Sequence, residues 1–168
     1  AAQHNTMVEA VQNHNPTVIV IDEIGTPKEV TAAKTISQRG VSLIGTAHGI
    51  SFDSLMKNPE LVPLLGGIKE VFLSDREAQV NSDGTKSKVK HERGGSPTFS
   101  VIIEIITKDK LRIYDNVALI VDAKLNRKPY VTELRWFKDG QMYAKLEQHN
   151  SLETKNGKID FVYVKNNN

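Results

Sequence analysis

The sequence of 168 residues contains no cysteine. A disulfide framework and a thiolate metal site are therefore excluded, and the absence fits a reducing compartment. No apolar run approaches the ~20 residues that a membrane-spanning helix needs. The formal net charge is only +2, so the chain as a whole lacks the strong positive field of a polyanion-binding protein. The five histidines show no HxxxH-type spacing, so a histidine-based metal site is not predicted.

An apolar stretch at residues 18–21 ends in two adjacent carboxylates, Asp22 and Glu23. A buried strand that carries Asp-Glu at its C-terminal end is typical of the Walker B segment of P-loop ATPases. There the first carboxylate holds the water shell of Mg²⁺, and the second orients and deprotonates the attacking water. The alternative is a core strand that simply ends in solvent-exposed acidic residues, a pattern that α/β proteins also contain. The residues downstream favour the first interpretation.

A helix is predicted directly after this strand. Thr26 and Glu29 form a capping box with Pro27 at the first helical position. The helix should end near Gly40, because glycine commonly follows a helix C-terminus. Its apolar stripe consists of Val30, Ala33 and Ile36.

A second buried strand is predicted at residues 41–46, and it too ends in polar residues, Thr46 and His48. Parallel strands joined by one helix place their C-terminal ends at the same edge of the sheet, where ligands bind in α/β proteins. We therefore expect Asp22, Glu23, Thr46 and His48 to lie at one site. The alternative for His48 is that it only caps the next helix.

Several segments of the chain resemble the RecA-like ATPase family of the stage III sporulation protein AA and its plastid and cyanobacterial relatives, which is similar in turn to type II secretion and type IV pilus motor ATPases. The likeness covers roughly residues 4–125. The segments that carry it are Asp-Glu-Ile-Gly-Thr at 22–26, Leu-Ile-Gly-Thr-Ala-His-Gly at 43–49, Leu-Leu-Gly-Gly-Ile at 64–68, Leu-Ser-Asp-Arg-Glu-Ala at 73–78, Glu-Arg at 92–93 with Ser-Pro-Thr-Phe at 96–99, and Tyr-Asp-Asn-Val-Ala at 114–118.

The resemblance implies a ring-forming ATPase motor or switch that uses ATP and Mg²⁺, with a homo-oligomer such as a hexamer as its assembly. It also implies a plastid or a bacterial-type cytoplasm as the location. The ATP-binding residues would be Asp22, Glu23 and Gly25, with Asp22 as the metal ligand. The catalytic residues would be Glu23, Thr46, His48 and Arg93, with Thr46 and His48 acting as a sensor of the γ-phosphate.

Arg93 and Arg76 are the candidates for an arginine finger that reaches the site of a neighbouring subunit. A fixed guanidinium can neutralise charge on the transferring phosphoryl group. The alternative for either residue is a surface salt bridge.

The Walker A loop of that family, GxxxxGK[ST], is absent from the sequence. Residues 66–69 lack the hydroxyl residue and the spacing, and residues 94–96 lack the lysine. We therefore expect the chain to be the C-terminal part of a longer ATPase, cut or diverged upstream of the Walker B strand.

The expected fold class is α/β: part of a RecA-like parallel sheet with flanking helices at residues 1–126, followed by a small β-rich appendage at 127–168. Residues 79–96 are polar and rich in lysine, which predicts a mobile loop. The remaining predicted elements are a helix capped by Thr6 and Glu9, a helix capped by Ser51, a short helix within 60–65, a third strand at 68–73 that continues the β-α alternation, a hairpin of 98–106 with 111–114, a helix capped by Asp115, and appendage strands at 131–137, 142–146, 152–155 and 159–164. The Asp139-Gly140 pair between the first two appendage strands predicts that they form a hairpin.

An alternative function is a catalytically inactive scaffold or a nucleic-acid-binding module. Exposed Trp136, Phe137 and Tyr143 could stack bases, although burial of at least two of them is the expected outcome. The lysines of residues 86–93 could contact nucleic acid, whereas the common outcome for such a run is a solvated loop. The Arg-x-x-x-His signature of the bacterial relatives' single-strand-binding domain is missing, because Arg127 is followed four residues later by Val131 and Arg135 by Asp139. Nucleic acid is therefore a weakly supported partner.

Overall fold

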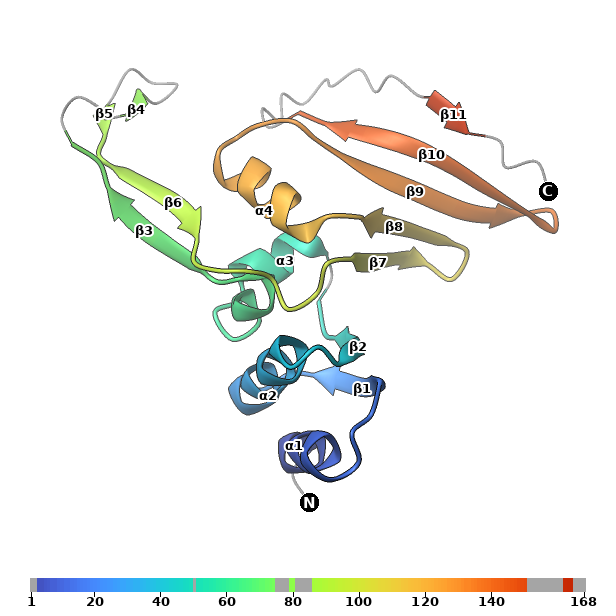
Figure 1. Cartoon of the computed structure of the whole chain (residues 1–168). Helices are drawn as coiled ribbons and strands as arrows, with labels where there is room; N and C mark the ends of the chain where they lie inside the picture. The colour runs from blue at the N-terminus through green and yellow to red at the C-terminus, as the bar shows by residue number, and fades with distance from the viewer. Residues whose placement is uncertain (1–2, 50, 75–78, 81–85, 151–161, 165–168) are drawn as a thin grey trace. The chain divides into compact units, whose positions relative to one another are not determined.

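The computed structural model describes residues 3–49, 51–74, 79–80, 86–150 and 162–164 (Figure 1). The chain divides into two compact units, the first made of Ala1–Gly67 with Ser96–Phe99 and the second of Ile68–Gly95 with Ser100–Asn168. The boundary that the sequence predicted at residues 126 and 127 therefore falls inside the second unit. Strand pairing explains the difference, because residues on both sides of that boundary belong to one sheet.

In its described residues, the first unit contains a pair of parallel strands and four helical segments. Strands β1 (Val18–Ile24) and β2 (Ser42–Ala47) pair in parallel and are joined by α2 (Pro27–Gln38). The other helical segments are α1 (Gln3–Asn13), α3 (Phe52–Lys57) and the 3₁₀ helix η1 (Val62–Leu65). The predicted strand, helix and parallel strand are thus confirmed. Every other strand pair in the described part of the chain is antiparallel.

Local capping explains where α2 begins and ends. Thr26 is the N-cap and forms the predicted capping box with Glu29, while Pro27 occupies the first turn. Gly40 follows the helix with φ +81°, a left-handed conformation that costs glycine little. Ser51 likewise caps α3, as predicted. The capping box predicted at Thr6 is wrong, because α1 already includes Gln3 and so Thr6 lies inside the helix.

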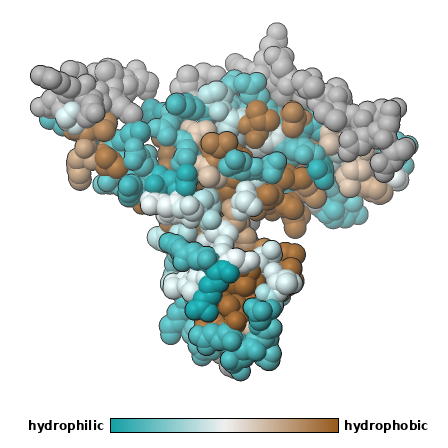
Figure 2. Space-filling view, viewed as in Figure 1, coloured by the Kyte–Doolittle hydropathy of each residue, from teal (hydrophilic) through white to brown (hydrophobic). Residues whose placement is uncertain are grey.

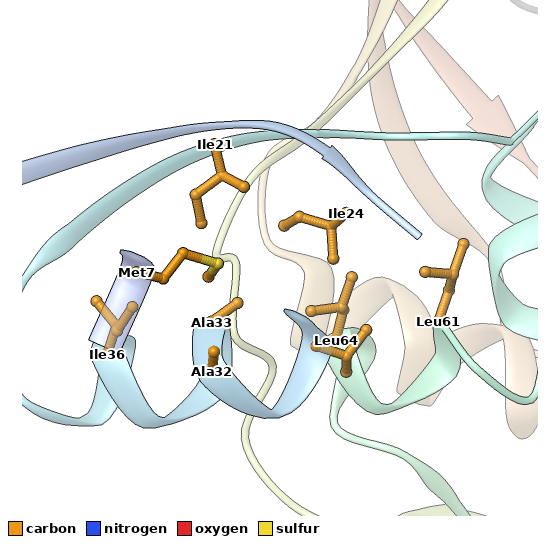
Figure 3. Close-up of a cluster of buried hydrophobic side chains, with 9 residues drawn as sticks. Met7, Ile21, Ile24, Ala32, Ala33, Ile36, Leu61 and Leu64 are labelled. Carbon is orange, nitrogen blue, oxygen red and sulfur yellow. The ribbon is translucent and has the colours of Figure 1, made fainter. Parts of the chain in front are cut away.

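The core of the first unit lies on one face of β1 and β2. Figure 3 shows Ile21 and Ile24 of β1 directed toward Met7 of α1 and Ala33 of α2, and Ala33 is fully buried. Ile36, Leu61 and Leu64 belong to the same cluster, and Ile19 and Leu43 pack against it.

The opposite face of the two strands is exposed. Val18, Val20 and Ile44 are 48%, 74% and 60% exposed, so the prediction that both strands are buried holds for alternate residues only. Alternation is the physical reason, since successive side chains of a strand point to opposite faces.

The second unit begins with a two-stranded ribbon. Strand β3 (Ile68–Phe72) occurs where a third strand was predicted, but it pairs antiparallel with β6 (Val89–Arg93). Strands β4 (Gln79–Val80) and β5 (Lys86–Ser87) pair with each other. The prediction that all of residues 79–96 form a loop is therefore wrong. The polar sequence of β6 has no apolar alternation, and its extended conformation is specified by its partner β3.

A five-stranded antiparallel sheet, ordered β11-β10-β9-β8-β7, makes up most of the second unit. Its strands are β7 (Ile102–Thr107), β8 (Lys110–Tyr114), β9 (Tyr130–Lys138), β10 (Gln141–His149) and β11 (Val162–Val164), and α4 (Val117–Leu125) connects β8 to β9. Both hairpins predicted within residues 98–146 are confirmed. The cap of α4 is Asn116, one residue after the predicted Asp115.

The turn between β9 and β10 has the geometry that its sequence predicts. Asp139 and Gly140 both have positive φ, 51° and 75°, as a two-residue turn matched to the twist of a hairpin requires. The strand predicted at 152–155 lies outside the described residues.

The two faces of this sheet differ in character. One face buries Tyr114, Thr132 and Leu134 together with an ion-paired Glu147. The other exposes large apolar side chains, which are Ile103, Ile105, Val131, Phe137, Met142 and Leu146. Figure 2 shows hydrophobic residues at the surface of the molecule. None of the helices in the described ranges is long and apolar enough to cross a bilayer.

Candidate functional site at the end of the parallel strands

A bulge interrupts the pairing of β1 with β2 at the two predicted carboxylates. Ile21 is opposite Gly45 and Ile24 is opposite Ala47, so β1 advances three residues while β2 advances two. The extra residue falls at Asp22 and Glu23. Bulges bend a strand and change the direction of side chains, and they are rare between parallel strands. Glu23 itself has φ +57°, a left-handed conformation that is strained for a residue other than glycine.

Thr46 joins the two carboxylate residues. Its Oγ1 donates to Oδ1 of Asp22 at 3.1 Å. The same oxygen accepts the backbone N–H of Glu23 at 2.7 Å. In a regular strand, Asp22 and Glu23 would point to opposite faces. The bulge and the bonds of Thr46 instead bring both residues against the end of β2.

His48 completes the cluster. Its Nε2 lies 3.3 Å from Oε1 of Glu23, and the two side chains are 88% and 60% exposed. The contact is an ion pair when the imidazole is protonated and a hydrogen bond when the neutral ring carries its proton on Nε2. His48 therefore does more than precede the next helix, whose cap is Ser51. The structure brings together all four side chains that the sequence placed at one edge: Asp22, Glu23, Thr46 and His48. Their catalytic roles stay predictions.

Gly25 has a role within the chain. Its N–H donates to Oε2 of Glu29 at 3.1 Å, and the N–H of Thr26 donates to the same oxygen at 3.0 Å. The bond from Gly25 is the main reason that the pKa of Glu29 is lowered from its ordinary value. The N–H of Gly25 thus already has an acceptor within the chain, and the ATP-binding role of Gly25 stays a prediction.

Gln3 is a residue of the site that the sequence did not indicate. Its side-chain amide Nε2 donates to the backbone carbonyl of Asp22 at 2.8 Å. The two residues are 19 positions apart in the chain. The residue pattern around Gln3 gives no signal for this contact, so only the tertiary structure identifies it.

Arg93 forms an internal salt bridge in the second unit. Its Nε and Nη2 donate to the two carboxylate oxygens of Asp122 at 3.0 and 2.9 Å, and Nη1 donates to the carbonyl of Gly95. The side chain is 21% exposed. This geometry matches the salt-bridge alternative, and the arginine-finger role stays a prediction. Arg76 lies outside the described residues.

The donor set at the end of β1 and β2 fits a hard divalent cation. Mg²⁺ is commonly bound by one or two carboxylates, with phosphate and water oxygens as the other ligands. The exposed carboxylate of Asp22 and the hydroxyl of Thr46 supply oxygen donors of this kind. No group of three or more histidine, aspartate or glutamate side chains that could hold a metal occurs among the described residues.

The aromatic residues of the β9–β10 hairpin are more exposed than predicted. Trp136 and Tyr143 stack on each other, with ring centroids 5.5 Å apart and planes within 13°. Tyr143 is 38% exposed and Phe137 is 51% exposed, and Trp136 is half-buried. The prediction that at least two of the three are buried is wrong. Trp136 and Phe137 are consecutive in a strand, so they point to opposite faces of the sheet and cannot share one core.

Comparisons with known proteins find relatives along most of the chain. It is 46% identical over 136 residues to the protein SEEDLING PLASTID DEVELOPMENT 1 of Arabidopsis thaliana, a match that covers 79% of this chain and 19% of that protein. It is 42% identical over 152 residues to the uncharacterized protein ycf45 of Porphyra purpurea, covering 90% of this chain and 26% of that protein. The chain is thus homologous to these two proteins, but it spans only 19% and 26% of their lengths.

A shorter match supports part of the sequence resemblance. The chain is 39% identical over 51 residues to the stage III sporulation protein AA of Bacillus subtilis, which covers 30% of this chain and 17% of that protein. No family model matches the chain, and no solved structure matches it either.

Proposed function

We propose that this chain contributes the metal-binding and water-activating part of an ATP-hydrolysing site in a RecA-like P-loop ATPase, with a Walker A loop supplied from outside residues 1–168. The observation that carries the proposal is the hydrogen-bonded cluster of Asp22, Glu23, Thr46 and His48. It lies at the C-terminal ends of two parallel strands, where α/β proteins bind ligands.

The cluster suits phosphoryl transfer to water because its two carboxylates have different surroundings. Asp22 accepts a bond from the Thr46 hydroxyl, which fixes one carboxylate oxygen and leaves the residue exposed for contact with a hydrated cation. Mg²⁺ bound with ATP would neutralise charge on the transferring phosphate. The task of Asp22 in this proposal is to hold that cation.

In this proposal Glu23 is the water-orienting carboxylate. Its backbone is fixed by the bond to Thr46 and its carboxylate lies against His48. A general base needs a defined direction as well as a suitable proton affinity. Thr46 and His48 can therefore connect the orientation of Glu23 with the presence of the γ-phosphate, which is the sensor role proposed for them.

The biological setting belongs to the same proposal. A plastid location is supported by the name of the Arabidopsis relative, which refers to plastid development. A homo-oligomeric ring is supported by the resemblance to motor ATPases alone.

A second candidate is a non-hydrolysing nucleic-acid-binding module. The specific observation in its favour is the partly exposed stack of Trp136 on Tyr143, with Phe137 exposed on the opposite face of the hairpin. Bases can stack on such rings. The surrounding charges are mixed, since Arg135 pairs with Glu133 and Lys145 with Glu147, so the electrostatic contribution to nucleic-acid binding would be small.

The test is a steady-state ATPase assay on a protein in which a Walker A segment accompanies this sequence. Glu23→Gln should keep ATP binding while turnover falls by about 10² or more, because the base or water-orienting group is lost and the metal site remains. Asp22→Ala should weaken Mg²⁺-dependent binding instead. Glu9→Gln, at an exposed glutamate of α1, is the matched control and should leave both quantities unchanged. Unaltered turnover in Glu23→Gln would refute the proposal.

A further inference from the structure

The peptide unit between Asp22 and Glu23 is held at both of its polar atoms by side chains. Its carbonyl oxygen accepts the side-chain amide of Gln3 at 2.8 Å. Its N–H donates to Oγ1 of Thr46 at 2.7 Å. Gln3 belongs to α1 and Thr46 to β2, so two separate elements hold one peptide plane from its two ends.

This peptide unit is the one that the bulge removes from the strand ladder. The register between β1 and β2 is regular up to Ile21 opposite Gly45 and resumes at Ile24 opposite Ala47. A backbone group that leaves the ladder needs another partner. Side chains that replace the ladder bonds here also determine how the peptide plane is rotated, and with it the φ of +57° at Glu23.

We infer that Gln3 is a positioning residue for Glu23: its bond to the Asp22 carbonyl locks the rotated peptide and thereby directs the Glu23 carboxylate. A strained residue persists only where the surrounding structure over-determines it. Thr46 alone fixes the N–H end. Gln3 fixes the carbonyl end, so rotation of this peptide back toward a regular strand breaks bonds at both ends. The inference deepens the proposed function and rests on it for the catalytic consequence, whereas the conformational part stands by itself.

The first measurement is amide hydrogen exchange at Glu23, followed by NMR on the chain of residues 1–168. Gln3→Ala removes the side-chain donor, and the loss of one hydrogen bond corresponds to exchange at Glu23 that is faster by about three- to tenfold. The matched control is Gln12→Ala, which makes the same chemical change at an exposed position of the same helix. Helix content measured by circular dichroism should be equal in the two variants.

The second measurement is the energetic coupling between Gln3 and Thr46, the two side chains that bond the peptide unit between Asp22 and Glu23. Gln3→Ala and Thr46→Val act on opposite ends of one peptide unit, so their effects on exchange at Glu23 should be non-additive. Additive effects, or exchange at Glu23 that is the same in Gln3→Ala and Gln12→Ala, would overturn the inference.

The catalytic consequence is tested in the protein that also contains a Walker A segment. Gln3→Ala should lower kcat by about three- to tenfold with KM for ATP unchanged, because only the direction of Glu23 is altered. A fall in kcat that Gln12→Ala reproduces would refute the positioning role. A different outcome is that the unmodified protein hydrolyses no ATP while exchange at Glu23 still depends on Gln3. The proposed function would then be refuted, and the conformational role of Gln3 would be upheld.

Discussion

Glu23 should be a site where glycine is more stable than alanine. Its left-handed backbone, with φ +57°, costs an L-residue roughly 1–2 kcal/mol. Glycine avoids that cost but loses about 0.4–1 kcal/mol through its larger conformational freedom in the unfolded chain. Both Glu23→Gly and Glu23→Ala lose the exposed contact with His48, so this contact cancels in the comparison. We expect Glu23→Gly to exceed Glu23→Ala in free energy of unfolding by about 1 kcal/mol.

The matched control lies three residues earlier in the same strand. Val20 is exposed, and its pairing with Ile44 belongs to the regular part of the ladder. There the order should reverse, with Val20→Gly less stable than Val20→Ala by roughly 0.5–1 kcal/mol.

The assay is urea unfolding followed at NMR signals of the first unit, because the two compact units need not unfold together. The opposite signs at Glu23 and Val20 are the diagnostic result. A glycine variant at Glu23 that is less stable than its alanine counterpart would show that the residue is unstrained in solution, and the reasoning would be wrong.

Two further predictions concern ligand binding and pH. Residues 1–168 alone should bind MgATP no more tightly than about millimolar, because a Walker A loop and its lysine normally supply the phosphate cradle; calorimetry that gives a micromolar constant would contradict this. In the second unit, burial and a hydrogen bond to Glu104 raise the pKa of Tyr114 above its ordinary value of 10.0. The stability that the neutral Tyr114 hydroxyl contributes is fully present below the pKa that this tyrosine has in the unfolded chain. The contribution is lost as pH rises from there through the higher pKa of the folded state, so urea unfolding of the second unit should become easier above about pH 10. Tyr114→Phe should remove that dependence, and an unchanged alkaline loss in this variant would assign it to other groups.

The parts of the fold that the sequence predicted depend on short-range patterns. The cap of α2 at Thr26 and the turn at Asp139 and Gly140 are encoded by residues next to each other in the chain. The parallel pairing of β1 with β2 could be predicted as well, because a single helix joins the two strands.

The parts that the sequence did not predict depend on distant partners. Strand β6 pairs with β3 across residues 73–88, and its own residues carry no periodic apolar signal. The β9–β10 hairpin was predicted as a separate appendage, but β9 continues the sheet of β8.

At the site, the identity of the four polar residues could be predicted and their fine geometry could not. Asp22, Glu23, Thr46 and His48 end two apolar runs, which places them at one edge of the strands. The bulge, the positive φ of Glu23 and the contact from Gln3 have no signature in the residue pattern, since they arise only when α1, β1 and β2 pack together.

The bulge makes the arrangement of the two carboxylates a matter of residue count as well as residue type. Deleting one residue between Ile21 and Ile24 would restore an uninterrupted ladder with β2, and one of the two carboxylates would be lost. An insertion between Ile21 and Asp22 would shift both residues by one position relative to Thr46. Grafting this pair of carboxylates into another parallel sheet would therefore require the transfer of the extra residue and of both side chains that hold its peptide, as well as the Asp-Glu dipeptide.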